Sequence, residues 1–242
     1  MEIDGKIAVV TGAAAGIGLA VAGALAEEGA ALVIADVDSE EGRRAAEQLG
    51  GRFVQTDVLV DDDLRALIAA AEGLQILVNN AGEAPEPYYP EAPVEHWSRT
   101  LDLNLRSAMV ATQLALEAMT LGGAIVNVSS MAGYGLFPHG SPEYATAKAG
   151  LMRLTGALSP LGASHDVRVS CVCPDWVDTP AVQRSLVSMS EEERDKVPEL
   201  VSADEIAALV LDLIRDDSSA GRVVIRPADG PAMTMPVEGP CG

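Results

Sequence analysis

Short apolar runs rich in β-branched residues alternate with longer Ala- and Leu-rich stretches along this chain. The runs are almost continuously hydrophobic, which is typical of strands that are covered on both faces in a parallel sheet. The pattern predicts strands at residues 7–10, 31–35, 52–55, 76–78, 124–128, 167–173 and 222–225. It predicts helices between them, at residues 17–28, 40–49, 62–71, 97–119, 142–158 and 203–214.

This regular alternation indicates a doubly wound α/β fold, a Rossmann-like parallel sheet of about seven strands with helices on both faces. Ligands of such folds bind at the carboxyl ends of the strands, near the point where the strand order reverses. Residues that directly follow strands are therefore the candidates for a ligand site. The chain shows no internal repeat and no linker-like segment, so residues 1–242 are expected to form a single dinucleotide-binding domain.

A glycine-rich segment, TGAAAGIG over residues 11–18, joins the first predicted strand to the first predicted helix. Glycines at such a junction permit a tight turn and let a phosphate group approach the backbone. The free N–H groups and the positive dipole end of the helix favour a bound pyrophosphate. The segment therefore predicts a dinucleotide site that includes Gly12, Gly16 and Gly18.

An acidic residue, Asp36, follows the second predicted strand, 18 residues after Gly18. The interval agrees with the spacing of about 20 residues expected for a carboxylate that accepts hydrogen bonds from the ribose 2′-hydroxyl. Such a carboxylate repels a 2′-phosphate, and the glycine-rich segment has alanines at 13–15 and no Arg or Lys to hold one. We therefore expect NAD rather than NADP as the cofactor.

Tyr144 and Lys148 are four residues apart in the predicted helix 142–158, so they share one face. A phenol with an ordinary pKa near 10 is a poor base at neutral pH. A nearby ammonium group favours the phenolate, as does the positive ring of an oxidised nicotinamide. Lysine is scarce in this chain, and a compact ammonium suits the role. The pair predicts an acid/base that exchanges a proton with an alcohol or a ketone.

Five motifs follow one another in order over residues 5–230. They are Thr11-Gly12-x-x-x-Gly16-x-Gly18, Asn79-Asn80-Ala81-Gly82 after the fourth predicted strand, Asn104 in a helix, Ser129-Ser130 after the fifth strand, and Tyr144-x-x-x-Lys148. Together they resemble the short-chain dehydrogenase/reductase family, in its compact single-domain branch. The resemblance implies an NAD-dependent oxidoreductase that transfers a hydride between the cofactor and a secondary alcohol or ketone.

The resemblance also implies roles for the catalytic residues. Tyr144 is the acid/base, and Lys148 lowers its pKa. Ser130 hydrogen-bonds the reacting oxygen, and it is preferred to Ser129 by alignment with the family's Asn-x-Ser-Ser pattern. Asn104 resembles the asparagine that supports a proton relay, and a buried residue at a helix bend is the alternative interpretation.

Further cofactor contacts are implied by the same resemblance. The amide of Ile17 is assigned to the pyrophosphate, and Lys148, beside Tyr144, to the ribose hydroxyls. Asp57 and Val58 are assigned to the adenine, and Asn80, Ala81 and Gly82 to the ribose. The segment Pro174-Asp175-Trp176-Val177-Asp178-Thr179 resembles a Pro-Gly-x-x-x-Thr motif, in which Val177 and Thr179 hold the nicotinamide carboxamide and a phosphate.

Three residues depart from the family pattern, and one of them is Ser170, which stands where the family commonly has Asn. Asp175 replaces the usual Gly, so its carboxylate is expected to alter the loop or to lie near the cofactor phosphates. Pro160 falls within a helix that is usually long, and a proline inside a helix costs about 3 kcal/mol. We therefore expect a kink or an early end near Leu158. Relatives often use this helix as a subunit interface, so we expect a homo-oligomer, a dimer or a tetramer, whose assembly can differ from theirs.

Charge and cysteine content narrow the partners. With 36 acidic and 16 basic residues the formal charge is −20, which argues against nucleic acid and against an anionic membrane surface. The N-terminus lacks a signal-peptide pattern, and no apolar run spans a membrane, so a cytoplasmic protein is expected. Three cysteines, Cys171, Cys173 and Cys241, suggest neither a disulfide framework nor a metal site. Cys171 and Cys173 share one strand face and are expected to pack in the core.

The partner is expected to be a small-molecule substrate, a cyclic or long-chain alcohol or its ketone, held by loops 83–93, 131–141 and 181–198. These loops and their neighbour Trp176 carry three of the four tyrosines, which favours an apolar pocket, although ordinary loop packing is an equal alternative. Two other functions are kept open: an NADP-dependent carbonyl reductase, and a nucleotide-sensing protein on the same fold without turnover.

Overall fold

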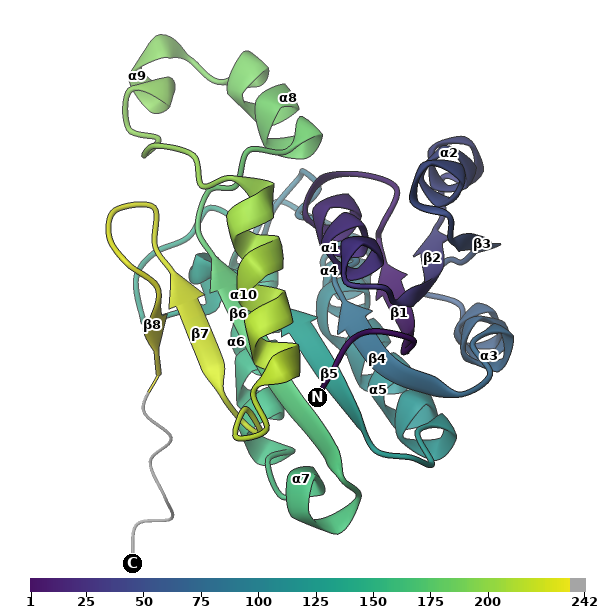
Figure 1. Ribbon diagram of the computed structural model, residues 1–242. Coiled ribbons are helices and arrows are strands. Elements are labelled where there is room, and N and C mark those ends of the chain that lie inside the picture. The colour runs from purple at the N-terminus through teal and green to yellow at the C-terminus, as the bar shows by residue number, and fades with distance from the viewer. Residues whose placement is uncertain (236–242) are drawn as a thin grey trace, which may run out of the picture.

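The apolar runs form an eight-stranded sheet in the computed structural model, which describes residues 1–235 (Figure 1). The strands are β1 (Ile7–Thr11), β2 (Ala31–Asp36), β3 (Arg52–Gln55), β4 (Leu74–Asn79), β5 (Gly123–Val128), β6 (Val167–Pro174), β7 (Val223–Arg226) and β8 (Met233–Thr234). Their spatial order is β3-β2-β1-β4-β5-β6-β7-β8. Neighbouring strands are parallel except β7 and β8, which are antiparallel. The doubly wound α/β fold is confirmed, with one short edge strand more than expected.

Helices cover both faces of the sheet. They are α1 (Gly16–Glu27), α2 (Ser39–Leu49), α3 (Asp61–Ala70), α4 (Val94–Leu101), α5 (Ser107–Ala118), α6 (Pro142–Ala157), α7 (Leu161–Ser164), α8 (Pro180–Ser188), α9 (Glu191–Arg194) and α10 (Ala203–Arg215). In β1, Ala8 and Val10 belong to a core shared with α1 and α10, whereas Val9 belongs to a second core shared with α3 and α5. Alternate side chains of one strand thus fill two layers, because successive residues point to opposite faces.

Two predicted segments differ from the structure. The helix expected at 97–119 is interrupted by a π-helical turn, Asp102–Arg106, between α4 and α5. The loop expected at 181–198 contains α8 and α9. Thr179 caps α8, and Ser190 forms a capping box with Glu193 at α9. These caps are sequence signals for helix starts, so short helices were predictable there.

Proline 160 and the cysteines behave as expected. Helix α6 ends at Ala157, and Pro160 precedes the separate short helix α7, so the early end near Leu158 is confirmed. Cys171 and Cys173 are fully buried in β6, with their sulfur atoms 3.8 Å apart. Cys241 lies outside the described residues.

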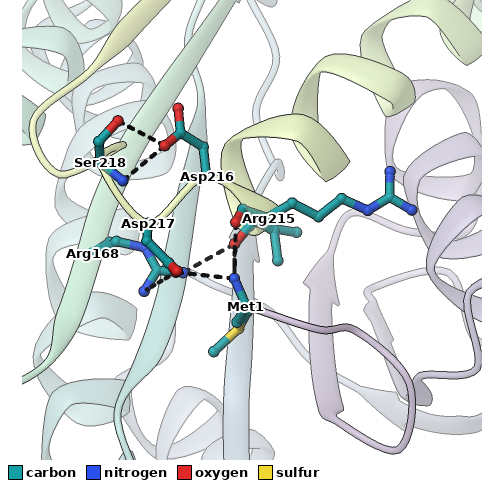
Figure 2. A network of polar contacts seen from close by, with 7 residues as sticks. Met1, Arg168, Arg215, Asp216, Asp217 and Ser218 are labelled. Atoms are coloured by element: carbon teal, nitrogen blue, oxygen red, sulfur yellow. Dashed lines mark hydrogen bonds and ion pairs between the residues drawn. The ribbon is translucent and has the colours of Figure 1, made fainter.

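A polar network joins the first residue to the end of α10, as Figure 2 shows. The amino group of Met1 donates to the carbonyl of Arg215 at 2.9 Å and to Asp217 at 3.1 Å. The Arg168 side chain, from β6, donates to the Ile214 carbonyl at 3.0 Å and lies 3.5 Å from Asp217. Two cations therefore meet the carbonyl end of α10, where the helix dipole favours positive charge.

Within residues 1–235, no helix combines the length and the apolar character needed to cross a membrane. The same residues contain no cluster of three or more His, Cys, Asp or Glu side chains arranged to hold a metal ion.

Candidate active site

The strand order reverses between β1 and β4, and the glycine-rich segment meets the Asn-Asn-Ala-Gly segment at their carboxyl ends. The Asn80 amide donates to the carbonyls of Thr11 and Gly12, both at 3.0 Å. The Thr11 hydroxyl in turn accepts from the backbone N–H groups of Asn80 and Ala81. Thr11 was not among the predicted site residues, although it opens the glycine motif. It joins two loops that both belong to the predicted nucleotide site.

The glycines are required by close approach as well as by backbone conformation. Gly12 has a φ of +64°, and a Cβ there would lie 2.9 Å from the Cα of Ala81. At Gly18 a Cβ would lie only 2.2 Å from the Gly12 carbonyl oxygen. Larger residues would therefore separate the loop from α1, whose first turn includes Ile17.

Helix α1 begins without a side-chain cap or an acidic residue in its first turn, as far as the described residues show. Helices α2 and α10, in contrast, are capped by Asp38 and Ser202. Uncapped N–H groups at a helix N-terminus leave donors for an anion. The start of α1 therefore fits the pyrophosphate of a dinucleotide.

The predicted adenosine end of the site lies at the ends of β2 and β3. Both Asp36 oxygens accept backbone N–H groups at 3.0 Å, one from Ala14 in the glycine-rich segment and one from Asp38. Asp57 accepts from Leu59, and Val58 is buried. The Asp36 carboxylate is therefore fixed beside the glycine-rich segment, where a ribose-binding acid is expected.

The segment after β6 approaches the same loop. A Cβ on Gly16 would lie 3.2 Å from the methyl group of Thr179, so the start of α1 and the cap of α8 are close together. Val177 is buried and forms a bridge with Val201. The Asp175 carboxylate, which follows Pro174, accepts from the backbone N–H of Ala228 at 3.2 Å. This contact attaches the unusual Asp175 to the loop after β7.

The predicted catalytic residues come together beside the ends of β4 and β5. The Lys148 Nζ lies 5.5 Å from the centre of the Tyr144 ring and donates to the Val128 carbonyl at 3.0 Å. The Ser130 hydroxyl accepts from the backbone N–H of Ala132 at 3.1 Å and lies close enough to the Tyr144 phenol to lower its pKa. Ser129 instead donates to the backbone carbonyl of Lys148 at 2.7 Å and is buried. Ser130 therefore faces the phenol, while Ser129 attaches β5 to α6.

Asn104 lies in the π-helical turn with its side chain toward Lys148. Its amide N–H groups donate to the carbonyls of Thr100 at 2.9 Å and Glu83 at 2.7 Å. Its buried Oδ1 has no hydrogen-bond partner within residues 1–235. A Cβ on Gly82 would lie 2.5 Å from this oxygen and 3.1 Å from the Lys148 Nζ, so both polar atoms surround Gly82. The Asn104 oxygen near the Lys148 amine is therefore suited to bind a water molecule that relays a proton.

The electrostatics of the pair differ from the expectation. Burial raises the pKa of Tyr144 above its ordinary value, and the hydrogen bond with Ser130 opposes the rise. Burial also lowers the pKa of Lys148 to about 8, opposed by the charges of the Cys171 and Cys173 sulfurs. The expected lowering of the Tyr144 pKa by Lys148 is therefore not seen in the protein alone. The reason is that the amine lies over the ring and bonds to Val128 while the phenol is desolvated.

A buried chain of amides and hydroxyls holds α6 against the sheet. The Asn79 amide donates to Thr112 at 3.1 Å and to Asn127 at 2.9 Å. The Asn127 amide donates to Thr155 on α6 at 2.9 Å. Asn127 begins the Asn-x-Ser-Ser pattern, so its position was a sequence signal that the prediction did not use.

A doubly wound sheet with a glycine-rich crossover at its reversal point defines the class of dinucleotide-binding α/β proteins. The family model described as enoyl-(acyl carrier protein) reductase matches residues 12–226. The cis-4-hydroxycyclohexanecarboxylate dehydrogenase of Sinomonas cyclohexanicum is 38% identical over 93% of this chain and 95% of its own. The 3-beta-hydroxysteroid dehydrogenase of Comamonas testosteroni is 35% identical over 90% and 92%.

A solved structure of actinorhodin polyketide ketoreductase with NADPH superposes with a TM-score of 0.85 at 28% identity, covering 93% of this chain and 97% of that one. This chain belongs to the short-chain dehydrogenase/reductase family. It is therefore an oxidoreductase that acts on hydroxyl or keto groups with a nicotinamide dinucleotide.

Proposed function

We propose that this protein is an NAD-dependent dehydrogenase that interconverts a secondary alcohol and its ketone. The observation that carries the proposal is the convergence of Ser130, Tyr144, Lys148 and Asn104 beside Gly82, next to the glycine-rich segment. A bound nicotinamide supplies or accepts the hydride. The protein has to supply the accompanying proton transfer and the orientation of the reacting oxygen.

Tyr144 is proposed as the group that takes or gives this proton at its phenolic oxygen. Ser130, whose hydroxyl lies near that phenol, orients the reacting oxygen through this hydroxyl. Lys148 adds positive charge behind the phenol. The buried Oδ1 of Asn104, which has no hydrogen-bond partner among the described residues, holds a water through which the proton reaches solvent. A positioned acid/base of this kind contributes on the order of 10² to 10⁴ in rate.

The preference for NAD rests on Asp36. Its carboxylate is held by two backbone N–H groups beside the glycine-rich segment, where it accepts ribose hydroxyls and repels a 2′-phosphate. An NADP-dependent carbonyl reductase is the second candidate, since the related ketoreductase structure contains NADPH. Steady-state kinetics with both cofactors decide between the two, and a preference for NADP would refute the first.

The substrate is proposed to carry an apolar ring or chain. Exposed apolar side chains lie on all three substrate loops, namely Tyr89, Leu136, Phe137 and Val187. Two relatives are named for cyclic alcohols, a hydroxycyclohexanecarboxylate and a hydroxysteroid. A panel of cyclic secondary alcohols and ketones, followed by NADH absorbance, tests the reaction class. Turnover confined to small anionic alcohols would contradict an apolar pocket.

The acid/base role is tested by Tyr144→Phe. We expect turnover to fall by roughly 10² or more, because the phenolic proton carrier is lost. The affinity for NAD, measured by fluorescence titration, should stay nearly the same. Thr146→Ala, an exposed change on the same helix, is the control and should keep full activity. Activity that survives in Tyr144→Phe would refute the assignment and favour a different base.

A further inference from the structure

Glu143 is a buried carboxylate directly before Tyr144. It lies in the first turn of α6 and is 6% exposed. Acidic side chains are rarely buried unless they are paired. Its position at a helix N-terminus is electrostatically favourable, but this explains a carboxylate at the surface equally well.

The hydrogen bonds of Glu143 are incomplete. Its Oε2 accepts a long bond, 3.4 Å, from the backbone N–H of Tyr89 in substrate loop 83–93. Its Oε1 is buried and has no hydrogen-bond partner within residues 1–235. The neighbouring Ser141 hydroxyl is buried and unpartnered in the same part of the chain. Buried polar atoms are normally satisfied, so the Glu143 carboxylate has the capacity to accept a further hydrogen bond.

The charge of Glu143 also acts on an aromatic side chain of the same substrate loop. Burial raises the pKa of Tyr88, and the charges of Glu86 and Glu143 add to the rise. The Tyr88 hydroxyl donates to the Ala84 carbonyl at 3.3 Å rather than to either carboxylate. The negative charge of Glu143 therefore reaches loop 83–93, which contains no Lys or Arg to neutralise it.

The remaining charges of the substrate loops are mostly negative. Loop 83–93 contains Glu83, Glu86 and Glu91 and no Lys or Arg, and loop 131–141 contains neither acids nor Lys or Arg. In segment 181–198 three basic residues accompany four acidic ones, and Lys196 is paired with Glu192. Its exposed Arg184 lies on α8. A substrate carboxylate would meet more negative than positive charge around the reacting group.

We propose that Glu143 determines substrate specificity: its carboxylate accepts a hydrogen bond from an ammonium or hydroxyl group of the substrate and excludes substrates that carry a carboxylate. This inference rests on the proposed function, because it places the substrate beside Tyr144. It separates this enzyme from the relative named for a hydroxycyclohexanecarboxylate, with which it shares 38% of its residues over the aligned region.

Matched ring alcohols test the charge preference on the wild-type enzyme. The probes are cis-4-aminocyclohexanol, cyclohexanol and cis-4-hydroxycyclohexanecarboxylate, compared by kcat/KM with NAD. We expect the amine to exceed the carboxylate by on the order of tenfold or more, since opposite charges a few ångströms apart attract appreciably even near a protein surface. A carboxylate turned over as well as the amine would overturn the proposal.

Glu143→Gln tests the residue, because it removes the charge and keeps the shape. The ratio of kcat/KM for amine over carboxylate should fall about tenfold in this variant. Glu91→Gln is the control, because Glu91 is an exposed carboxylate of substrate loop 83–93. It should leave that ratio within about twofold. An unchanged ratio in Glu143→Gln would overturn the assignment, since a purely structural role would lower stability without altering the ratio.

Calorimetry separates this inference from the reaction itself. The same three probes are titrated into the wild-type enzyme saturated with NADH. One outcome is that the amine binds more tightly than the carboxylate here while the kinetic assay with NAD shows no oxidation of any probe. In that case the specificity of Glu143 stands and the proposed alcohol oxidation fails. If binding shows no preference for the amine, the specificity proposal fails.

Discussion

At the scale of single residues, the site is governed by burial. Tyr144 and Lys148 share one helix face, as their spacing requires. Desolvation raises the pKa of Tyr144 and lowers that of Lys148, so it favours the neutral form of each group. The electrostatic partnership expected from the sequence is therefore weak in the protein alone. The positive ring of an oxidised nicotinamide would add to the charge of Lys148 and so favour the phenolate form in which Tyr144 acts as a base.

The buried Lys148 makes stability depend on pH. Its pKa is about 8 in the folded protein and 10.5 for the ordinary group, so between these values the unfolded chain binds more protons. Stability from this group therefore rises with pH in that window, while below about pH 8 both states are protonated and its penalty is constant. Relative to Lys148→Met, the wild type should gain about 1–2 kcal/mol between about pH 7.5 and about pH 9.5.

Urea unfolding at several pH values measures this difference. Lys196→Met, which removes an exposed lysine, is the control and should show no such trend against the wild type. A gap between wild type and Lys148→Met that stays constant across the window would contradict the lowered pKa.

At the scale of elements, two junctions decide how the site is built. The π-helical turn between α4 and α5 directs the Asn104 side chain to the carbonyls of Thr100 and Glu83 and places its Oδ1 near Lys148. Such turns are frequent at functional sites. The start of α1 is the second junction, where Gly18 lies against the Gly12 carbonyl.

Gly18→Ala should damage that second junction. The added Cβ would lie 2.2 Å from the Gly12 carbonyl oxygen, so the loop has to move away from the helix. We expect NAD affinity to fall at least about tenfold and stability by about 1–3 kcal/mol, as for other overpacked sites. NADH fluorescence titration and urea unfolding measure the two effects.

Gly23→Ala, in the same helix, is the matched control. A Cβ there would lie 3.8 Å from its nearest neighbour, a methyl group of Leu49. Alanine also favours helix over glycine by up to about 1 kcal/mol, so this variant should be as stable as the wild type or more so. Equal losses in both variants would show that the junction is not special.

At the scale of the whole molecule, the network of Figure 2 joins segments that are far apart in sequence. Arg168 is 8% exposed and connects β6 to the end of α10 and to Asp217, which also binds the Met1 amino group. Because α10 packs on α1, this network supports the helical layer that contains α1, the helix that follows the glycine-rich segment.

Arg168→Met should lower the free energy of unfolding by about 1–3 kcal/mol. The substitution keeps much of the aliphatic packing but removes the donor to the buried Ile214 carbonyl. Asp217 is largely exposed, so its loss of a partner adds little. Arg153→Met, at an exposed position of α6, should change stability by no more than about 0.5 kcal/mol in the same urea measurement. Equal effects of the two substitutions would contradict this account.

The sequence by itself determined the order of strands and helices, the doubly wound fold and the motifs at the strand ends. It did so because strand and helix periodicity, glycine junctions and the Tyr-x-x-x-Lys spacing are local properties of the chain. The short helices α8 and α9 were also encoded locally, in caps at Thr179 and Ser190 that the prediction did not use.

Only the tertiary structure decided which groups lose contact with water. The break at Asn104, the burial of Glu143 with an oxygen that has no partner within the described residues, and the raised pKa of Tyr144 all depend on how loops and helices pack on one another. Desolvation and the distances between separate elements are set by the whole packed chain, so no local pattern in the sequence reveals them.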